Sequence, residues 1–294
     1  MSATTTTILP QISARRRRTD KFMRGTLLAG TIIALIPLVL IIYYLLHKGL
    51  SAWTTSGFFT TDPTGSFFGS PGGIRSAIIG SLLIVALATV ISIPAGIGVA
   101  LYLTEYGKDS WFANTVRYFV DVMTGVPSIM FGLFVYIVLV VGRFGGSGFA
   151  AWKGAVALAL LMLPIVIRSA EVVLLLVPSS LREAALALGA PRWRVVFKVV
   201  LPTARSGLLT GSLLAIARGM GETAPLLFTV STAFALTYDL SAQMNTMPFL
   251  IYTDITSPRE AIQNIAWGTA LTLVVIVLIL NLIARFIASR SRTA

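Results

Sequence analysis

The sequence predicts an all-α, polytopic membrane protein with six transmembrane helices. Hydrophobic residues make up 56% of the 294 residues, charged residues only 12%, and the mean hydropathy is +0.86. In soluble domains about a quarter of the residues are charged. A membrane-spanning helix needs about 20 predominantly apolar residues, and six stretches meet that need: 26–46, 76–103, 119–141, 154–176, 206–235 and 266–287. We expect one transmembrane domain over 26–294 and no second, soluble domain.

The segment before the first span is a threonine-rich tail followed by the arginine run 15–18. We predict that residues 1–25 form a disordered cytoplasmic tail. A basic run can bind nucleic acid, but directly before an apolar span it is typical of a topology signal. We therefore expect no nucleic-acid partner. The first span also lacks the small-residue exit of a cleaved signal peptide, so we expect it to remain as a membrane helix.

The lysine and arginine distribution predicts the orientation. With both termini in the cytoplasm, 16 of these residues lie on the inner side, and five lie outside: Lys48, Arg75, Arg143, Lys153 and Arg259. Positive residues concentrate on the cytoplasmic side of membrane proteins. We therefore expect a multi-pass protein of the inner or plasma membrane with both termini cytoplasmic, in contact with membrane lipid. This orientation places the loop 178–202 in the cytoplasm.

Local features of the spans are less specific. Prolines at positions 37, 94, 127 and 164 permit kinks, but prolines are common in membrane helices and we assign none of them a hinge role. Asp121 follows Arg117 by one helical turn, which predicts an ion pair between them at the membrane boundary. Cysteine is absent, which excludes disulfides and thiol chemistry. We predict no catalytic residue and no metal site in this chain.

The loop 178–202 is an island of charge between the fourth and fifth spans. Ser180 and Glu183 have the spacing of a capping box, and apolar residues follow at helical spacing. Gly189 stands where a C-terminal cap belongs, and Pro191 suits the first turn of a second short helix. Two short amphipathic helices outside the membrane predict a partner protein or a lipid surface for their apolar faces.

This loop resembles the coupling motif of the permeases of ABC importers. The match runs Glu183-Ala184-Ala185, then Gly189 after three residues, and after nine more an aliphatic residue, any residue, Leu201 and Pro202. The resemblance implies a type I importer (MetI-like) permease fold, in which this loop docks onto an ATPase subunit. The chain has no G-x-x-x-x-G-K-[ST] loop for nucleotide phosphates. We therefore expect no cofactor in this chain, with ATP and Mg bound by the partner ATPase.

Two pairs of charges fall inside the predicted spans: Arg218 with Glu222, and Arg168 with Glu171. A charge at mid-bilayer costs about 2.5–3.5 kcal/mol on insertion scales, so each pair needs a partner or a water-filled path. A guanidinium offers two parallel donors to an oxyanion such as phosphate. The pairs therefore either line or gate an anion pathway, or only lock helices together, and the spacing does not decide between these roles.

A narrower resemblance comes from several motifs, which are similar to those of the PstA-type family of phosphate permeases: Gly72–Leu82, Gly125–Ile129, Leu163-Pro164, Arg218–Thr229 and Met247-Pro248. The resemblance as a whole covers about residues 26–287. The resemblance implies a pore shared with a PstC-like permease, a homodimeric PstB-like ATPase, a PstS-like phosphate-binding protein and inorganic phosphate as substrate.

Two alternatives have the same sequence features. The same architecture could carry another oxyanion, such as sulfate, molybdate or phosphonate. In an ion-coupled secondary transporter that works without partners, Arg218 and Glu222 would relay protons or ions, but the coupling motif would have no role. The outer segment 237–265 suits contact with a binding protein or sister permease, or packing against its own pore.

Overall fold

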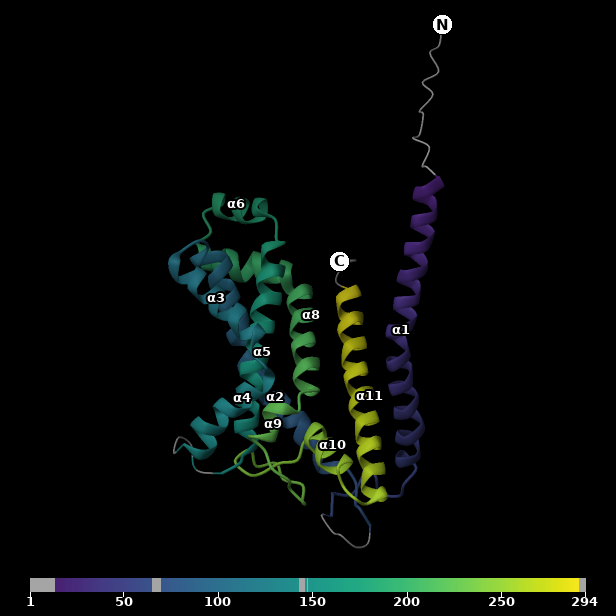
Figure 1. The fold of residues 1–294 in the computed structure, drawn as a ribbon. Coiled ribbons are helices and arrows are strands. Elements are labelled where there is room, and N and C mark those ends of the chain that lie inside the picture. The colour runs from purple at the N-terminus through teal and green to yellow at the C-terminus, as the bar shows by residue number, and fades with distance from the viewer. Residues whose placement is uncertain (1–13, 65–69, 143–145, 147, 291–294) are drawn as a thin grey trace. The chain divides into compact units, whose positions relative to one another are not determined.

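A computed structural model describes residues 14–64, 70–142, 146 and 148–290 (Figure 1). These residues form helices and connecting loops, with one isolated bridge between Pro63 and Gly72. The all-α prediction is confirmed. The chain divides into two compact units, Met1–His47 and Lys48–Ala294. Arg143 and Arg292, which entered the charge count, lie outside the described residues.

Helix α1 (Ala14–Trp53) begins inside the predicted disordered tail. Residues 14–25 are helical, so the prediction of disorder is wrong for them; residues 1–13 lie outside the described residues. The arginines, lysine and methionine of this stretch are good helix formers, and no proline interrupts them before the apolar span. Asp20 and Arg24 pair at 3.1 Å on successive turns and add a small stabilisation.

The second, fourth and sixth predicted spans are continuous helices. Helix α2 (Arg75–Leu101) runs on into the π-helical turn η1 (Tyr102–Gly107), and the other two are α5 (Ala151–Leu175) and α11 (Glu260–Arg290). Among the described residues five helices are long and apolar enough to cross a membrane, and a bent pair of helices provides a sixth span. Six spans are thus present among the described residues only if the two helices of the bent pair together count as one span.

The bent pair replaces the third predicted span, 119–141. Helix α3 (Trp111–Gly125) ends before Pro127, and α4 (Ser128–Val135) with η2 (Tyr136–Val141) leaves at 103° to it. Pro127 has no N–H to donate, and it pushes the preceding residue out of the helical region, so that Val126 is extended at φ −73°, ψ 130°. The prediction of one continuous helix here is wrong.

The helix of the fifth predicted span, 206–235, ends earlier than predicted. Helix α8 (Leu201–Met220) stops at Gly221, and only the short α9 (Ala224–Leu227) follows before the loop that leads to α10 (Met247–Ile255). Pro225 and the glycines before it account for the stop. At its other end the helix is longer than predicted, because α7 (Arg192–Val195) and η3 (Val196–Val200) lead directly into α8.

The core of the second unit lies between α2, α5 and α8. Its fully buried residues include Ile84 and Ala88 of α2, Leu158 and Met162 of α5, and Ala215 of α8. Small residues let the helices approach closely: a Cβ on Gly96 would lie 2.6 Å from the Val166 side chain. Within this unit, α6 (Ser179–Ala187) lies at one end, and α9 and α10 lie at the other (Figure 1).

Candidate functional site

The loop 178–202 folds as two short helices, as predicted, but its first helix is capped differently. Helix α6 begins at Ser179 after Pro178, so Ser180 lies within the first turn, and no side chain caps the helix. The predicted capping box is wrong because Pro178 already fixes the entry of the chain one residue earlier. Pro191 likewise precedes the first residue of α7 rather than lying within its first turn.

The C-terminal cap of α6 is confirmed at Gly189. This residue has φ +79°, its N–H donates to Leu186 O at 2.9 Å, and the Ala190 N–H donates to Ala185 O at 3.2 Å. These two bonds form a Schellman motif, whose left-handed position favours glycine because a Cβ is disfavoured there. The glycine of the motif therefore ends α6 and turns the chain towards α7.

Helix α6 lies on the surface and has no buried residue. Glu183 and Ala184 are exposed, whereas Ala185 packs partly against the small core between α5, α7 and α8, as does Leu201 at the start of α8. Pro202 is exposed in the first turn of α8. The exposed fraction of Leu188 is 89%, so the loop presents apolar surface beside the acidic Glu183.

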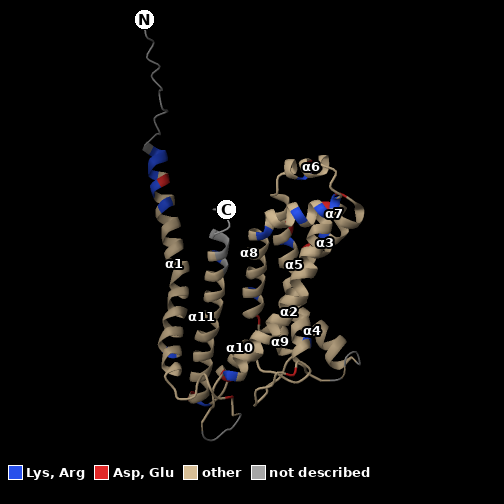
Figure 2. Cartoon of the chain, turned by 180° about the vertical axis from the view of Figure 1, so that it is seen from behind, with Lys and Arg blue, Asp and Glu red and all other residues tan. Residues whose placement is uncertain are grey.

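Lysine and arginine residues gather at this end of the second unit, around α3, α6 and α7 (Figure 2). Arg192, Arg194 and Lys198 belong to this group, and the Arg194 guanidinium stacks over the Trp193 ring with 5.3 Å to its centroid. The opposite end of the unit carries fewer lysine and arginine residues (Figure 2). The basic residues thus lie mostly at one end of this unit, and the assignment of that end to the cytoplasm stays a prediction.

Arg182, next to the motif, anchors α6 to the rest of the unit. Its Nε and Nη2 donate to Glu105 Oε1 of η1 at 3.0 and 2.8 Å, and its other bonds reach the carbonyls of Leu174 and Val177 at the end of α5. Sequence reasoning missed both Arg182 and Glu105. Their 77-residue separation gives no local pattern, and the only signal was a pair of opposite charges at the same predicted membrane face.

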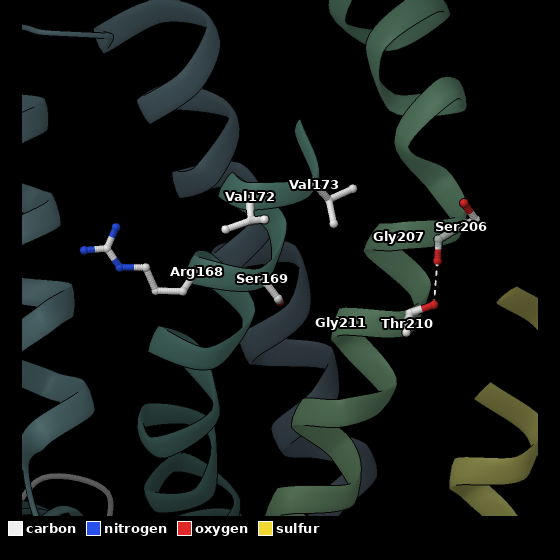
Figure 3. Close-up of a pocket in the computed structure, with 8 residues that line it drawn as sticks. All are labelled: Arg168, Ser169, Val172, Val173, Ser206, Gly207, Thr210 and Gly211. Carbon is white, nitrogen blue, oxygen red and sulfur yellow. Dashed lines mark hydrogen bonds between the residues drawn. The ribbon is translucent and has the colours of Figure 1, made fainter. Parts of the chain in front are cut away.

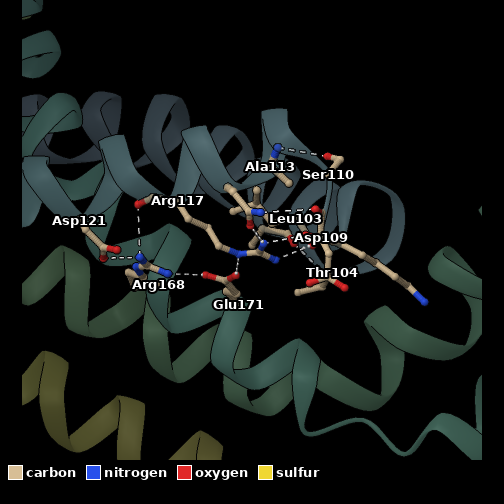
Figure 4. A network of polar contacts seen from close by, with 12 residues as sticks. Leu103, Thr104, Asp109, Ser110, Ala113, Arg117, Asp121, Arg168 and Glu171 are labelled. Carbon is tan, nitrogen blue, oxygen red and sulfur yellow. Dashed lines mark hydrogen bonds and ion pairs between the residues drawn. The ribbon is translucent and has the colours of Figure 1, made fainter.

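The second polar cluster joins α3 to α5 (Figure 4). The predicted pair of Arg168 with Glu171 is present at 2.8 Å, and both residues also reach α3. Arg117 Nε contacts Glu171 Oε1 at 2.7 Å, and Arg168 forms an ion pair with Asp121. The predicted pair between Arg117 and Asp121 is therefore wrong. The contact from Arg117 gives the buried Glu171 a second guanidinium beside that of Arg168, whereas a pair of Arg117 with Asp121 within one exposed helix would add only a few tenths of a kcal/mol.

Arg117 also fixes the turn before its own helix. Its Nη1 donates to Lys108 O at 2.6 Å and its Nη2 to Leu103 O of η1 at 2.9 Å. Lys108 has φ +39°, the single positive φ of a non-glycine residue among those described. Such a conformation is strained and persists only where surrounding contacts hold it. The turn between η1 and α3 is therefore held in place by the Arg117 side chain.

The predicted pair of Arg218 and Glu222 is present at 2.7 Å, at the point where α8 ends. Glu222 lies beyond the helix, and its N–H donates to Gly219 O at 3.3 Å. The Arg218 side chain is 62% exposed and that of Glu222 only 9%. Arg218 lines a cavity of about 310 Å³ together with Thr124, Pro127 and Ser128 at the break of the bent span. The intramembrane arginine and the break between α3 and α4 thus face the same space.

A second pocket, of about 570 Å³, lies between α5 and α8 (Figure 3). Its lining includes Ser169 and Val173 of α5 and the two glycines Gly207 and Gly211 of α8. Arg168 belongs to the lining, but its guanidinium points away from α8 (Figure 3) towards the partners Asp121 and Glu171. Arg168 and Arg218 therefore belong to separate clusters.

The outer segment packs against its own chain. Met247, Pro248 and Leu250 of α10 are buried, and the Met247 N–H donates to Ser81 Oγ of α2 at 2.8 Å. A Cβ on Gly80 would lie 2.0 Å from the Asn245 carbonyl oxygen. Of the two arrangements left open by the sequence, packing on the chain's own helices is the one observed for α10.

Asp62 joins three chain segments at the same end. It accepts bonds from the Arg75 side chain at 2.6 and 3.2 Å, from the Ser76 N–H at 3.1 Å and from the Leu236 N–H at 3.3 Å. The hydrogen bond from Arg75 is the main cause that holds the pKa of Asp62 below its usual value. At neutral pH this carboxylate therefore stays charged and keeps the outer segments together.

Comparison with known proteins shows the family to which this chain belongs. Residues 92–293 match the family described as "Binding-protein-dependent transport system inner membrane component". The chain is 41% identical over 279 residues to the "Phosphate transport system permease protein PstA" of Yersinia pestis, covering 95% of this chain and 93% of the relative. The chain belongs to the PstA family of permeases.

Other members of the PstA family match over a similar length. The PstA protein of Haemophilus influenzae is 41% identical, covering 92% of this chain and 94% of the relative. PstA 1 of Mycobacterium tuberculosis is 39% identical, covering 96% of this chain and 92% of the relative.

Solved structures show the fold of this PstA-family chain. A chain of an inward-facing MetNI methionine ABC transporter matches with a TM-score of 0.54 at 20% identity, covering 74% of this chain and 94% of that one. A chain of a bacterial ABC transporter involved in alginate import matches with a TM-score of 0.62 at 13% identity, covering 93% of this chain and 96% of that one. The importer-permease fold expected from the coupling motif is confirmed.

Proposed function

We propose that the chain is a permease subunit of an ATP-driven importer for inorganic phosphate, and that it forms half of a pore together with a PstC-like permease. The observation that carries this proposal is the 41% identity to a phosphate transport permease over 95% of the chain. The alternatives of another oxyanion and of an ion-coupled transporter receive no support from the relatives.

The chain contributes the pore, and partner subunits contribute the energy and the capture of substrate. A homodimeric PstB-like ATPase, which binds ATP and Mg, docks on the exposed face of α6, where Glu183 and Leu188 are accessible. A PstS-like phosphate-binding protein delivers substrate at the opposite end. Both termini are cytoplasmic in this proposal, because that orientation puts 16 of the lysine and arginine residues on the inner side.

Arg218 is the residue that we assign to the phosphate pathway. Its guanidinium is more than half exposed, it faces a cavity at the break between α3 and α4, and it offers a planar pair of donors to an oxyanion. Glu222 is its counter-ion and keeps the charge stable when no phosphate is present. Arg168 and Glu171 instead lock α3 to α5, since every charge in that cluster already has a partner.

Transport follows from cycles of the ATPase. When ATP closes the ATPase dimer, α6 moves with it and the pore opens outward to accept phosphate from the binding protein. Hydrolysis returns α6, and the pore opens to the cytoplasm. The substrate is therefore moved by a change of shape, and this chain catalyses no reaction itself.

The test is the ATPase activity of the complete complex in nanodiscs, with and without phosphate-loaded binding protein. We expect stimulation by the loaded protein, and loss of that stimulation in Glu183→Arg, because the reversed charge prevents docking of the ATPase. Phosphate-loaded protein should stimulate, and sulfate or molybdate should not replace phosphate. Equal stimulation by those anions would assign the pore to another oxyanion. Transport by this chain alone, without ATP, would support the ion-coupled alternative.

A further inference from the structure

Three groups of charged side chains connect the coupling loop to the break in the bent span. We propose that Arg182 is the positioning residue of this connection: through Glu105 and Arg117 it transmits the movement of α6 to α3, and thereby to the cavity at Arg218. This proposal rests on the proposed function, because it assigns the route by which ATP hydrolysis reaches the pore.

The first link joins α6 to η1 and α5. Arg182 donates two bonds to Glu105 and one each to the Leu174 and Val177 carbonyls, at 2.6 to 3.0 Å. The side chains of Arg182 and Glu105 are only 21% and 11% exposed, so this pair is screened much less than a surface pair. Because α6 buries no residue, a bond network of this kind is the strongest polar attachment available to it.

The second link joins η1 to α3. Glu105 lies in η1, and the Leu103 carbonyl of the same turn accepts a bond from Arg117 Nη2 at 2.9 Å. Arg117 also holds the strained Lys108 turn through the Lys108 carbonyl at 2.6 Å. A π-helical turn followed by a strained residue has more than one arrangement within reach, and both features occur often at functional positions. A displacement of Glu105 therefore moves the start of α3.

The third link lies between α3 and the pore cavity. The ion pairs of Arg117 with Glu171 and of Asp121 with Arg168 hold α3 against α5 at two successive turns. These two attachments make α3 and α5 move together, and about 12 Å separate Arg117 from the end of α3 at Gly125. The break that follows lines the cavity with Arg218. A small rotation of the joined α3 and α5, started by a movement of α6, is thus delivered to the cavity at Arg218.

The test measures the coupling ratio, phosphate transported per ATP hydrolysed, in proteoliposomes that contain the complete complex. Arg182→Gln and Glu105→Gln should each lower this ratio about fivefold, within the range usual for coupling between distant sites. The double variant should be no worse than the poorer single variant, because the two residues act through one contact. Arg205→Gln is the matched control: Arg205 is exposed at the start of α8, outside the three links, and its ratio should remain unchanged.

Glu105→Gln also covers the case in which Arg182→Gln does not assemble, because it leaves the bonds of Arg182 to the α5 carbonyls in place. A second readout uses the absence of cysteine from the chain. Spin labels on cysteines at the exposed Met130 of α4 and Leu214 of α8 should report a distance change when ATP binds. This change should be lost in Glu105→Gln while ATP still binds to the ATPase.

The outcomes separate this proposal from the proposed function. If the wild-type complex does not transport phosphate with ATP, the proposed function fails. If the wild type does transport but Glu105→Gln keeps both its coupling ratio and the distance change, only the connection through Arg182 is overturned. Additive losses in the double variant would also overturn it, because they would mean that the two residues act through separate contacts.

Discussion

Arg117 of α3 contacts Glu171 of α5 at 2.7 Å, although a carboxylate on the next turn of its own helix was available to it. The side chain of Glu171 is only 7% exposed and accepts bonds from two guanidiniums, which supply the partners that a buried carboxylate needs. The preference for the partner on the other helix makes α3 and α5 one mechanical unit.

Removal of the Glu171 charge is expected to destabilise the protein. In Glu171→Gln two arginines lose their common carboxylate, and since both are partly exposed we expect a loss of about 2 kcal/mol, below the 3–5 kcal/mol of a fully buried pair. Thermal unfolding of the purified complex measures this. Asp20→Asn is the control, because its pair with Arg24 is exposed and should contribute little. Equal unfolding temperatures for Glu171→Gln and the control would contradict the assignment.

Two glycines of α2 should respond in opposite ways to the same substitution. In Gly80→Ala the new Cβ would lie 2.0 Å from the backbone oxygen of Asn245, so the outer segment must shift, at a cost of about 1–3 kcal/mol. Gly98 has no heavy atom within 4 Å of that position, so Gly98→Ala should be neutral or slightly stabilising. Thermal unfolding of the two variants tests the packing of this outer segment on α2. A stable Gly80→Ala protein would show that the close approach is wrong.

Asp254 of α10 should make the stability depend on pH. Burial raises the pKa of this carboxyl to about 6, and the bond from the Thr253 hydroxyl only partly opposes the shift. Between about pH 4 and pH 6 the folded protein therefore binds a proton that the unfolded chain does not. The stabilisation of the folded state relative to higher pH is lost as the pH rises through 6.

In Asp254→Asn that loss cannot occur. We expect the variant to be more stable than wild type by about 1–2 kcal/mol at pH 8, and equally stable near pH 4. Thermal unfolding measured across this pH range gives the comparison. A difference between the two proteins that stays constant from pH 4 to pH 8 would mean that the Asp254 carboxyl is not the cause.

Some features that depend on neighbouring residues could be predicted from the sequence, whereas contacts between distant residues could not. The cap at Gly189 follows from the need for a left-handed position at the end of α6, and the pair of Arg218 with Glu222 follows from their separation by one turn. Arg182 gave no such signal, because its partner Glu105 is 77 residues away.

The two broken spans show a different limit. Hydropathy averaged over 119–141 or 206–235 stays high across Pro127 and Gly221, so apolarity alone predicts a continuous helix at both places. The backbone effects of proline and glycine prevailed there because neighbouring segments bind the polar groups that each break exposes. The Ala150 N–H, for example, donates to Thr229 O in the segment that follows α9. Both breaks lie near Arg218: the break at Pro127 lines the same cavity, and α8 stops at Gly221, three residues after Arg218.

The central claim is that phosphate passes Arg218 in a pore driven by a partner ATPase. The most direct test measures uptake of radiolabelled phosphate and ATP hydrolysis in the same proteoliposomes, for wild type, Arg218→Lys and Arg218→Gln. We predict that all three hydrolyse ATP, that Arg218→Gln loses uptake about 100-fold, and that Arg218→Lys falls between, because lysine keeps the charge but not the paired donors. Wild-type uptake in Arg218→Gln, with hydrolysis intact, would contradict the claim that phosphate passes this residue.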